Sequence, residues 1–259
     1  MPAESGLILT VLGRWSPYPP HGGANPGYLV EAGGVRLLLD CGSGVLANMH
    51  RFCTAFDLAA VVITHLHPDH FTDLYALRAE RAYGRVPPPS LPPLPLFAPA
   101  NAVTFLPGCL PRAESRQEFL DGFDFRPLEA GVGQVGPIAL RFVRTAHPEP
   151  CHAVEVRYND RRLVYSADTG PTEAVERLAE GADLFLCECS LREDAADLAV
   201  RLGHLTASMA GASARRARVR RLLLTHFMTS HHAVQESRAA AAKEFADVRV
   251  AEEGVHYEV

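Results

Sequence analysis

The sequence predicts an α/β fold made of two related halves, and three observations support this prediction. Apolar segments of strand length alternate with segments of helical pattern along the chain. Two short sequence patterns occur once in each half. The chain has 259 residues, 47% of them hydrophobic and 21% charged, which is typical of a globular protein with a large core. We therefore expect residues 1–259 to form a single domain.

The first half of the chain begins with predicted strands over 7–12, 28–31, 35–39 and 61–63. A helix is predicted after His70, with Leu74 and Leu77 on one face and an end near Gly84. The proline-rich segment 87–95 follows, and proline is unsuited to a helix or a central strand. We interpret it as a stiff surface connection into a strand at Leu96-Phe97, with a polyproline ligand as the alternative.

The second half repeats this alternation, with predicted strands over 138–144, 153–158, 163–166, 184–187 and 222–224. Helices are predicted after Pro171, a good first helical residue, after Thr206, a good N-cap, and from Ala233. Five arginines lie within residues 215–221 and could contact phosphates. We interpret them as the solvated end of a helix and the turn into the next strand.

The two repeated patterns are apolar strands that end in chemically useful side chains. The strand before Asp40 resembles the strand before Asp168, and Thr64-His65 resembles Thr225-His226 in the same way. Ligand sites form where strands end, because a strand is rigid and its last residue emerges from the core. The repeats therefore predict that polar side chains gather at one edge of two sheets.

Composition excludes several classes of protein. The formal net charge of −5 argues against a large nucleic-acid footprint. No apolar run approaches the roughly 18 residues that span a bilayer, and no signal peptide is visible. The six cysteines include no CxxC pair, and Cys187 and Cys189 are interpreted as alternate residues of a buried strand. We expect free thiols in a cytoplasmic protein without a membrane partner.

One histidine-rich segment indicates metal binding. The chain has 12 histidines, and Thr64-His65-Leu66-His67-Pro68-Asp69-His70 places three imidazoles and a carboxylate within six residues. In an extended segment His65 and His67 point to the same side, where their nitrogens need a partner. Borderline ions such as Zn²⁺ favour imidazole nitrogen at about 2.0–2.1 Å together with carboxylate oxygen. The segment predicts a divalent metal site.

The same segment resembles the HxHxDH signature of the metallo-β-lactamase superfamily, and the later residues of that pattern follow in order. This resemblance implies a four-layer αβ/βα sandwich with its site where the strand ends of the two sheets meet. It also implies two divalent metal ions, Zn²⁺ with Mn²⁺ or Fe²⁺ as alternatives. By the resemblance, the first ion is held by His65, His67 and His147, the second by Asp69, His70 and His226, and Asp168 bridges them.

Two further segments resemble the ribonuclease Z-like branch of the superfamily. One contains His204 before a predicted helix, and the other contains Glu188 at the end of a predicted strand. In that branch a histidine, an aspartate and a glutamate are linked around the scissile phosphate, which here implies His204, Asp69 and Glu188. The loop 13–27 lacks the PxKxRN-type motif of tRNA-processing members, and no long basic arm is present. We therefore expect a small phosphodiester, such as a cyclic one, and no large nucleic acid.

The expected activity is hydrolysis by a hydroxide shared between the two ions, with Asp69 orienting it. His204 would hydrogen-bond the phosphoryl oxygen or protonate the leaving group. A hydrolase of the same superfamily that acts on a lactone, thioester or β-lactam is one alternative. A non-catalytic accessory protein that binds metal or a metabolite is another. A homodimer is compatible with either.

The remaining histidines have no assigned chemistry. His152 and His21 are candidates for lining the pocket, since one follows His147 closely and the other lies in the N-terminal loop. His50 and His256 are interpreted as structural. The pair at 231 and 232 is interpreted as surface.

Overall fold

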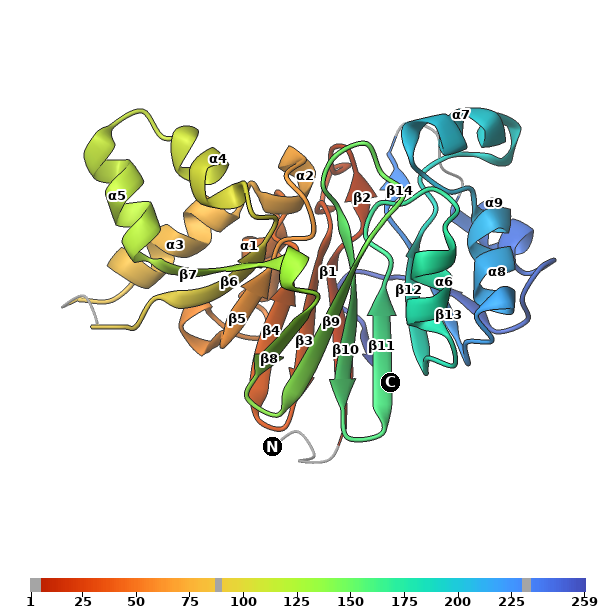
Figure 1. Cartoon of the computed structure of the whole chain (residues 1–259), viewed down its shortest axis with the longest axis horizontal. Coiled ribbons are helices and arrows are strands. Elements are labelled where there is room, and N and C mark those ends of the chain that lie inside the picture. The colour runs from red at the N-terminus through yellow and green to blue at the C-terminus, as the bar shows by residue number, and fades with distance from the viewer. Residues whose placement is uncertain (1–5, 87–89, 230–233) are drawn as a thin grey trace.

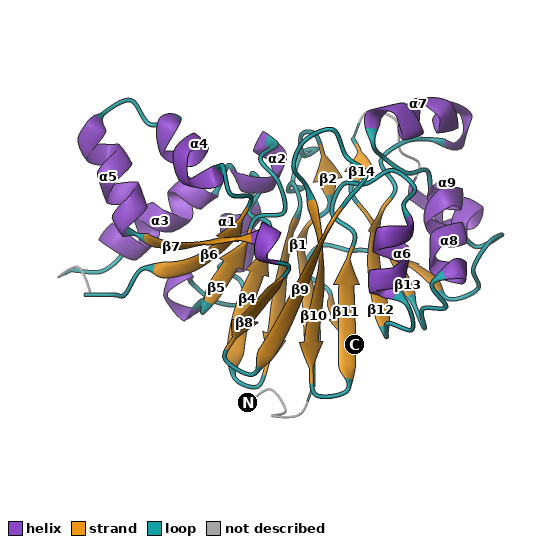
Figure 2. Cartoon of the chain, viewed as in Figure 1, coloured by secondary structure: helices purple, strands orange, loops and turns teal. Residues whose placement is uncertain are grey.

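Two β-sheets pack face to face, and helices cover the outer face of each sheet (Figures 1 and 2). This computed structural model describes residues 6–86, 90–229 and 234–259. Helices from the first half of the chain lie against one sheet, and helices from the second half lie against the other (Figure 1). The predicted αβ/βα sandwich of two related halves is confirmed.

The first half supplies helices between successive parallel strands. In chain order its elements are β1 Ile8–Gly13, β2 Trp15–Ser16, β3 Gly27–Ala32, β4 Val35–Leu39, α1 Val45–Met49, the 3₁₀ turn η1 Ala55–Asp57, β5 Ala60–Val62, α2 Pro68–Phe71, α3 Leu74–Tyr83, β6 Leu94–Ala98, α4 Ala102–Gly108, α5 Ala113–Asp121 and β7 Phe123–Pro127. The predicted helix after His70 is α3, which buries Leu74 and Leu77 and ends at Gly84. Sequence reasoning missed α4, α5 and β7, and of these α5 and β7 each bury a single residue, Phe119 and Phe123.

The second half has the same build. Its elements are η2 Leu128–Ala130, β8 Val132–Val135, β9 Ile138–Arg144, β10 His152–Tyr158, β11 Arg161–Tyr165, α6 Glu173–Ala179, β12 Leu184–Glu188, η3 Glu193–Ala195, α7 Ala196–Leu202, α8 Ala207–Arg216, β13 Leu222–Thr225, β14 Phe227–Met228, α9 Val234–Ala241, β15 Val248–Val250 and β16 His256–Glu258. Helix α8 begins as predicted at the N-cap Thr206, whose hydroxyl accepts a hydrogen bond from the Met209 N–H.

The strand order repeats between the sheets. Within the described residues one sheet runs β16-β1-β3-β4-β5-β6-β7 and the other runs β15-β13-β12-β11-β10-β9-β8. Each sheet passes from antiparallel to parallel pairing at a strand followed by one of the repeated aspartates, β4 before Asp40 and β11 before Asp168. The carboxyl ends of parallel strands meet at one edge of a sheet. Both aspartates therefore stand at equivalent places at the same edge of the sandwich.

Apolar side chains fill both faces of the central strands. In β4, Leu37 and Leu39 pack between the two sheets, whereas Leu38 points outward against the helices of the first half, and all three have 0% exposure. A third apolar layer lies between the second sheet and its helices. Strands covered on both faces read as continuous apolar runs, which is why they could be found from the sequence. They hold their terminal residues on a rigid base.

One local prediction was wrong, and a helix follows Pro171 as predicted but begins later than expected. Pro95 lies inside β6, a strand with neighbours on both sides, although proline was excluded from such a position. Pairing with β5 involves only Leu96 and Phe97, so Pro95 opposes no residue of that strand and its missing N–H costs no bond there. Pro171 is not the first residue of α6, because Thr172 caps the helix with its hydroxyl and Glu173 begins it. Residues 87–89 of the proline-rich segment lie outside the described residues.

The arginine-rich run is a helix end and turn, as interpreted from the sequence. Its arginines pair with carboxylates on neighbouring elements: Arg215 with Glu244, Arg216 with Glu176, Arg218 with Glu180, Arg220 with Asp183 and Arg221 with Asp247. The run is therefore largely neutralised. None of the helices in the described part of the chain has the length and apolarity to cross a lipid bilayer.

Candidate metal centre

Strand ends from both sheets come together at the edge of the sandwich beside α2 (Figure 1). The donor atoms form two adjacent sets, and within each set they lie within 4.8 Å of one another. One set contains His65, His67, His147 and Asp168, and the other contains Asp69, His70 and His226. The structure thus brings together all seven residues that the family resemblance implied as metal ligands.

Asp168 lies between the two sets. Its Oδ2 is 3.5 Å from Nε2 of His65, and its Oδ1 is 3.1 Å from Nε2 of His226 and 3.5 Å from Nε2 of His70. Its side chain is 3% exposed. One carboxylate therefore faces donors of both sets, which is the arrangement of a bridging ligand.

A second buried carboxylate, Asp40, holds in place the segment from the first sheet that carries His65 and His70. Its Oδ1 accepts the backbone N–H of Thr64 at 2.8 Å. Its Oδ2 accepts from Thr64 Oγ1 at 3.0 Å, from Nδ1 of His70 at 2.8 Å and from the Tyr165 hydroxyl at 2.9 Å. A carboxylate on the far nitrogen of a ligating imidazole fixes its orientation and its tautomer. Asp40 was found in the sequence only as part of the repeated pattern.

A chain of hydrogen bonds holds His204 and His226, the histidines that follow strands of the second sheet. Ser190 Oγ donates to Glu188 Oε2 at 2.6 Å and accepts from Nδ1 of His226 at 2.7 Å. Glu188 Oε1 accepts from Nδ1 of His204 at 2.8 Å. Because Nδ1 of His204 is occupied by Glu188, its Nε2 is the nitrogen left for the site. One nitrogen of His204 lies within 4.8 Å of donor atoms of Asp168 and His226.

Glu188 itself is enclosed. It has 0% exposure, and its remaining hydrogen bonds come from the backbone N–H groups of Thr169, Ser190 and Leu205. The resemblance implied that Glu188 is linked with His204 and Asp69 around the scissile phosphate. The structure contains the link from Glu188 to His204, and protein donors occupy both oxygens of Glu188. Its geometry is that of a group that orients His204 and His226.

The electrostatics of the site favour bound cations. Burial lowers the pKa of His65 and of His147, so these imidazoles keep a free lone pair. Burial opposes charge on His70 as well, but Asp168, Asp40 and Asp69 outweigh it and raise the pKa to about 10. The same carboxylates stabilise any cation on the His70 imidazole, whether a proton or a metal ion.

The charge on His204 has a separate cause. Burial disfavours the imidazolium, but the charge and hydrogen bond of Glu188 outweigh burial and raise the pKa of His204 to about 9. Glu188 therefore favours the protonated form of the His204 imidazole, next to Asp168 and His226.

The backbone at the strand ends is in an unusual conformation. Asp40, Ala167 and His226 have φ values of 56°, 51° and 59°. The left-handed region is costly for residues other than glycine and is maintained where the surroundings fix it. These three residues lie at the ends of β4, β11 and β13, where the chain turns to aim donors at the centre. Strain is thus concentrated at the candidate site.

The donor set fits divalent metal ions. Nε2 of His65 and Oδ1 of Asp168 are buried and have no hydrogen-bond partner among the described residues. Nε2 of His70 and Nε2 of His226 face each other at 3.1 Å, while their Nδ1 atoms are held by Asp40 and Ser190. Buried donors without partners cost free energy unless a ligand binds them. Imidazole nitrogens with carboxylate oxygens are a common ligand set for Zn²⁺ and similar ions.

The N-terminal loop reaches the site through a residue that sequence reasoning missed. Ser16 Oγ donates to Oδ2 of Asp69 at 2.9 Å, and β2 pairs with β14 directly after His226. His21, the candidate from this loop, is exposed. A single serine in a loop forms no sequence pattern that indicates a role, so its contact with Asp69 could be found only from the fold.

The other histidines within the described residues belong to neither donor set. His152 is buried at the start of β10. His50 bonds Glu80 at 2.9 Å, and His256 bonds Thr10 at 2.7 Å, as expected for structural roles. The histidines at 231 and 232 lie outside the described residues.

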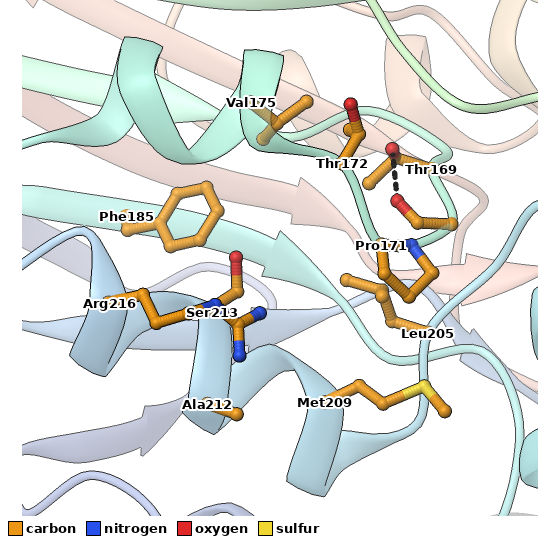
Figure 3. Close-up of a pocket in the computed structure, with 11 residues that line it drawn as sticks. Thr169, Pro171, Thr172, Val175, Phe185, Leu205, Met209, Ala212, Ser213 and Arg216 are labelled. Carbon is orange, nitrogen blue, oxygen red and sulfur yellow. Dashed lines mark hydrogen bonds between the residues drawn. The ribbon is translucent and has the colours of Figure 1, made fainter.

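A separate pocket of about 200 Å³ lies between α6, β12 and α8 (Figure 3). Phe185 and Met209 contribute to its largely apolar wall, and no residue of the two donor sets lines it. Thr169 and Leu205 also line it, and their N–H groups are the ones that bind Glu188. The pocket therefore shares a wall with the segments that fix Glu188.

Comparison with known proteins places these features in a family. The family described as "Beta-lactamase superfamily domain" matches residues 35–227. The probable metallo-hydrolase YhfI of Bacillus subtilis is 28% identical over 255 residues, which cover 97% of this chain and 100% of YhfI. A ribonuclease Z of Mycolicibacterium paratuberculosis is 31% identical over 271 residues and covers 93% of each chain.

Solved structures agree with the sequence relatives. The crystal structure of YhfI has a TM-score of 0.84 with 27% identity over 98% of this chain and 100% of that one. The short form of human tRNase Z has a TM-score of 0.76 with 22% identity over 96% of this chain and 98% of that one. At 22% identity, the similarity to human tRNase Z is evidence of a shared fold.

Proposed function

The chain belongs to the metallo-β-lactamase superfamily as a metallo-hydrolase, and from this premise we propose that it cleaves a small phosphodiester at a pair of divalent metal ions. The first ion would be held by His65, His67 and His147, the second by Asp69, His70 and His226, with Asp168 shared. When bound, such a pair supplies an activated water and neutralises charge that develops on the phosphoryl oxygens. Zn²⁺ is our first choice, with Mn²⁺ or Fe²⁺ as alternatives.

The observation that carries this proposal is the pairing of His204 with buried Glu188. The hydrogen bond of 2.8 Å fixes Nδ1 of His204, so Nε2 presents a proton to a group bound at the centre. A phosphodiester is an anion, gains negative charge on attack and releases an alkoxide that needs a proton. A charged donor supports each of these steps, whereas a neutral lactone or thioester gains less from it.

The chain's own residues would divide the work as follows. His204 would hydrogen-bond the phosphoryl oxygen or protonate the leaving group. Asp69, held by Ser16 at 2.9 Å, would orient the attacking water. Glu188 would position His204 without touching the substrate, because its oxygens are already occupied.

We favour a small diester over tRNA for reasons local to this chain. The loop 13–27 lacks the basic motif of tRNA-processing relatives, and Ser16 in that loop bonds Asp69. The arginine-rich run is paired with carboxylates. Ribonuclease Z similarity makes a precursor tRNA the necessary comparison substrate.

Two further proposals concern the whole chain. We propose a single domain over residues 1–259, supported by the pairing of β16 with β1 across the full length of the sequence. We also propose a cytoplasmic location, supported by six free cysteines, of which only Cys109 is exposed.

The proposed function predicts two metal ions per chain and turnover of small diesters. Elemental analysis of the purified protein measures the first. Hydrolysis of bis(p-nitrophenyl) phosphate and of a 2′,3′-cyclic nucleotide, beside a precursor tRNA and a panel of lactones and thioesters, measures the second. Faster turnover of a lactone or thioester would favour the other hydrolases of the superfamily. Fewer than two ions, with no activity after metal reconstitution, would favour an accessory protein.

We expect His204→Ala to keep its metal ions and its fold but to lose about 10²-fold to 10⁴-fold in kcat, the usual contribution of a general acid or base. Steady-state kinetics with bis(p-nitrophenyl) phosphate and metal analysis provide the measurement. His50→Ala is the matched control, since His50 is an exposed histidine whose ring bonds Glu80. An unchanged kcat in the His204 variant would remove this residue from the mechanism.

A further inference from the structure

A second polar group lies beside the donor sets, on the side of His65 and His147. It consists of Arg144 at the end of β9, His152 at the start of β10 and Glu129 in η2, and we call it the Arg144 cluster. The backbone N–H of His152 donates to the carbonyl of Thr64 at 3.1 Å, directly before His65. Nη2 of Arg144 reaches the carbonyl of His147 at 3.5 Å. The cluster is thus attached to both segments that carry the first donor set.

The strand register fixes where these side chains point. Arg144 and His152 are directly opposite each other in the antiparallel pair of β9 and β10, so their side chains lie on the same face of the sheet. The pair two residues further in, Phe142 and Val154, belongs to the core between the sheets. Arg144 and His152 therefore continue the inner face toward the edge where the metal donors gather.

The cluster has unused donors. His152 is 5% exposed, and its Nδ1 is buried with no hydrogen-bond partner among the described residues. Arg144 has no carboxylate within ion-pair distance in the part of the chain that is described, whereas Arg141 on the same strand pairs with Glu155 at 3.4 Å. Both oxygens of Glu129 take the N–H of Ala100, at 3.1 and 3.2 Å. The buried Nδ1 of His152 lacks a partner, and the exposed guanidinium of Arg144 beside it is free to bind an anion.

We propose that Arg144 and His152 bind a second anionic group of the substrate, a phosphate or a carboxylate on the alcohol portion of the phosphodiester. This inference rests on the proposed function and adds a substrate class to it. Guanidinium groups bind phosphate and carboxylate through paired N–H donors, and the imidazole adds a donor from the opposite strand. The preferred substrate is then a diester with at least two negative groups.

Kinetics with paired substrates test this assignment. Bis(p-nitrophenyl) phosphate carries one anionic group, the diester phosphate itself. The paired substrates are p-nitrophenyl diesters in which the other alcohol also carries a carboxylate or a phosphate monoester. We expect Arg144→Ala to raise KM for the diesters with a second anionic group about 10-fold to 100-fold, as for loss of a charge-assisted hydrogen bond, and to change KM for bis(p-nitrophenyl) phosphate less than about 2-fold. Comparing KM for the diester with a carboxylate and the diester with a phosphate monoester shows which anionic group is preferred.

Two variants make the result specific. Arg141→Ala removes an arginine from the outer face of the same strand and should leave all KM values unchanged. Arg144→Lys keeps the charge without the planar fork and should restore part of the affinity. An equal rise of KM in Arg144→Ala for diesters with and without the second anionic group would overturn the proposal, as would no rise for either.

Equilibrium binding separates this proposal from the proposed function. Calorimetric titration of the purified protein with adenosine 5′-monophosphate and adenosine 3′,5′-bisphosphate compares one phosphate with two and requires no turnover. We expect the bisphosphate to bind more tightly, and Arg144→Ala but not Arg141→Ala to abolish the difference. Equal affinities for the two nucleotides in the unmodified protein would overturn the inference, whether or not any diester is hydrolysed.

Discussion

Asp168→Ala is expected to lose most of its bound metal and to lower kcat at least about 10³-fold. Its carboxylate oxygens face His65 on one side and His70 and His226 on the other, so one substitution weakens both donor sets. Loss of a group that stabilises the transition state costs about 10² to 10³ on its own, and loss of metal adds to this. Elemental analysis and turnover of bis(p-nitrophenyl) phosphate measure the two effects.

A control separates this effect from a general loss of charge. Asp160 lies exposed in the turn between β10 and β11, at the opposite end of the strand from Asp168, and Asp160→Ala should retain both metal and activity. The free energy of unfolding of the metal-free Asp168 variant should fall. Burial opposes the charge of Asp168, but the imidazoles of His226, His70 and His65 outweigh it and hold the pKa of the carboxyl well below its usual range, so its removal leaves them without a buried partner. Full metal content with full activity in Asp168→Ala would show that the two sets do not share this residue.

The fold and the donor residues could be predicted because both leave local signals. Central strands buried on both faces are continuous apolar runs, and Asp40, His65, Asp168 and His226 follow such runs directly. The family resemblance read from these residues is confirmed by the match over residues 35–227 and by the ribonuclease Z relatives. Roles for individual residues remain proposals that the variants above test.

The contacts that hold the donors could not be predicted, because they join segments far apart in the sequence. Ser16 reaches Asp69 across 53 positions, and Tyr165 reaches Asp40 across 125. Neither hydroxyl belongs to a motif. For the same reason the sequence could not show that protein donors occupy both oxygens of Glu188, since these donors come from other segments of the chain.

Asp40 and Glu188, two buried carboxylates outside the donor sets, have parallel tasks. Asp40 holds Nδ1 of His70 from the first sheet, and Glu188, through Ser190, holds Nδ1 of His226 from the second. Each also ties the neighbouring strand end in place, Asp40 through Thr64. The related halves therefore supply equivalent supports as well as equivalent ligands, and removing either support should disturb one half of the centre first.

Asp40→Ala is expected to lower the free energy of unfolding by about 3–5 kcal/mol, as for breaking a buried charged network. It leaves the donors on Thr64, His70 and Tyr165 without an acceptor at a position with 0% exposure. Affinity for the second metal ion should fall about 10-fold to 100-fold, because His70 loses the partner that orients it. Urea unfolding and competition with a metal chelator measure the two quantities.

Two milder substitutions separate the loss of stability from the loss of metal affinity. Asp40→Asn keeps a residue type that tolerates the left-handed backbone at φ 56° and retains one oxygen, so its loss of stability should be smaller than that of alanine. Tyr165→Phe removes only one of the donors and should cost about 1–3 kcal/mol while leaving metal affinity near that of the unmodified protein. If Tyr165→Phe weakened metal binding as much as Asp40→Ala, orientation of His70 would not be the reason. General packing between the sheets, where the Tyr165 ring meets Tyr28, would then control the metal centre.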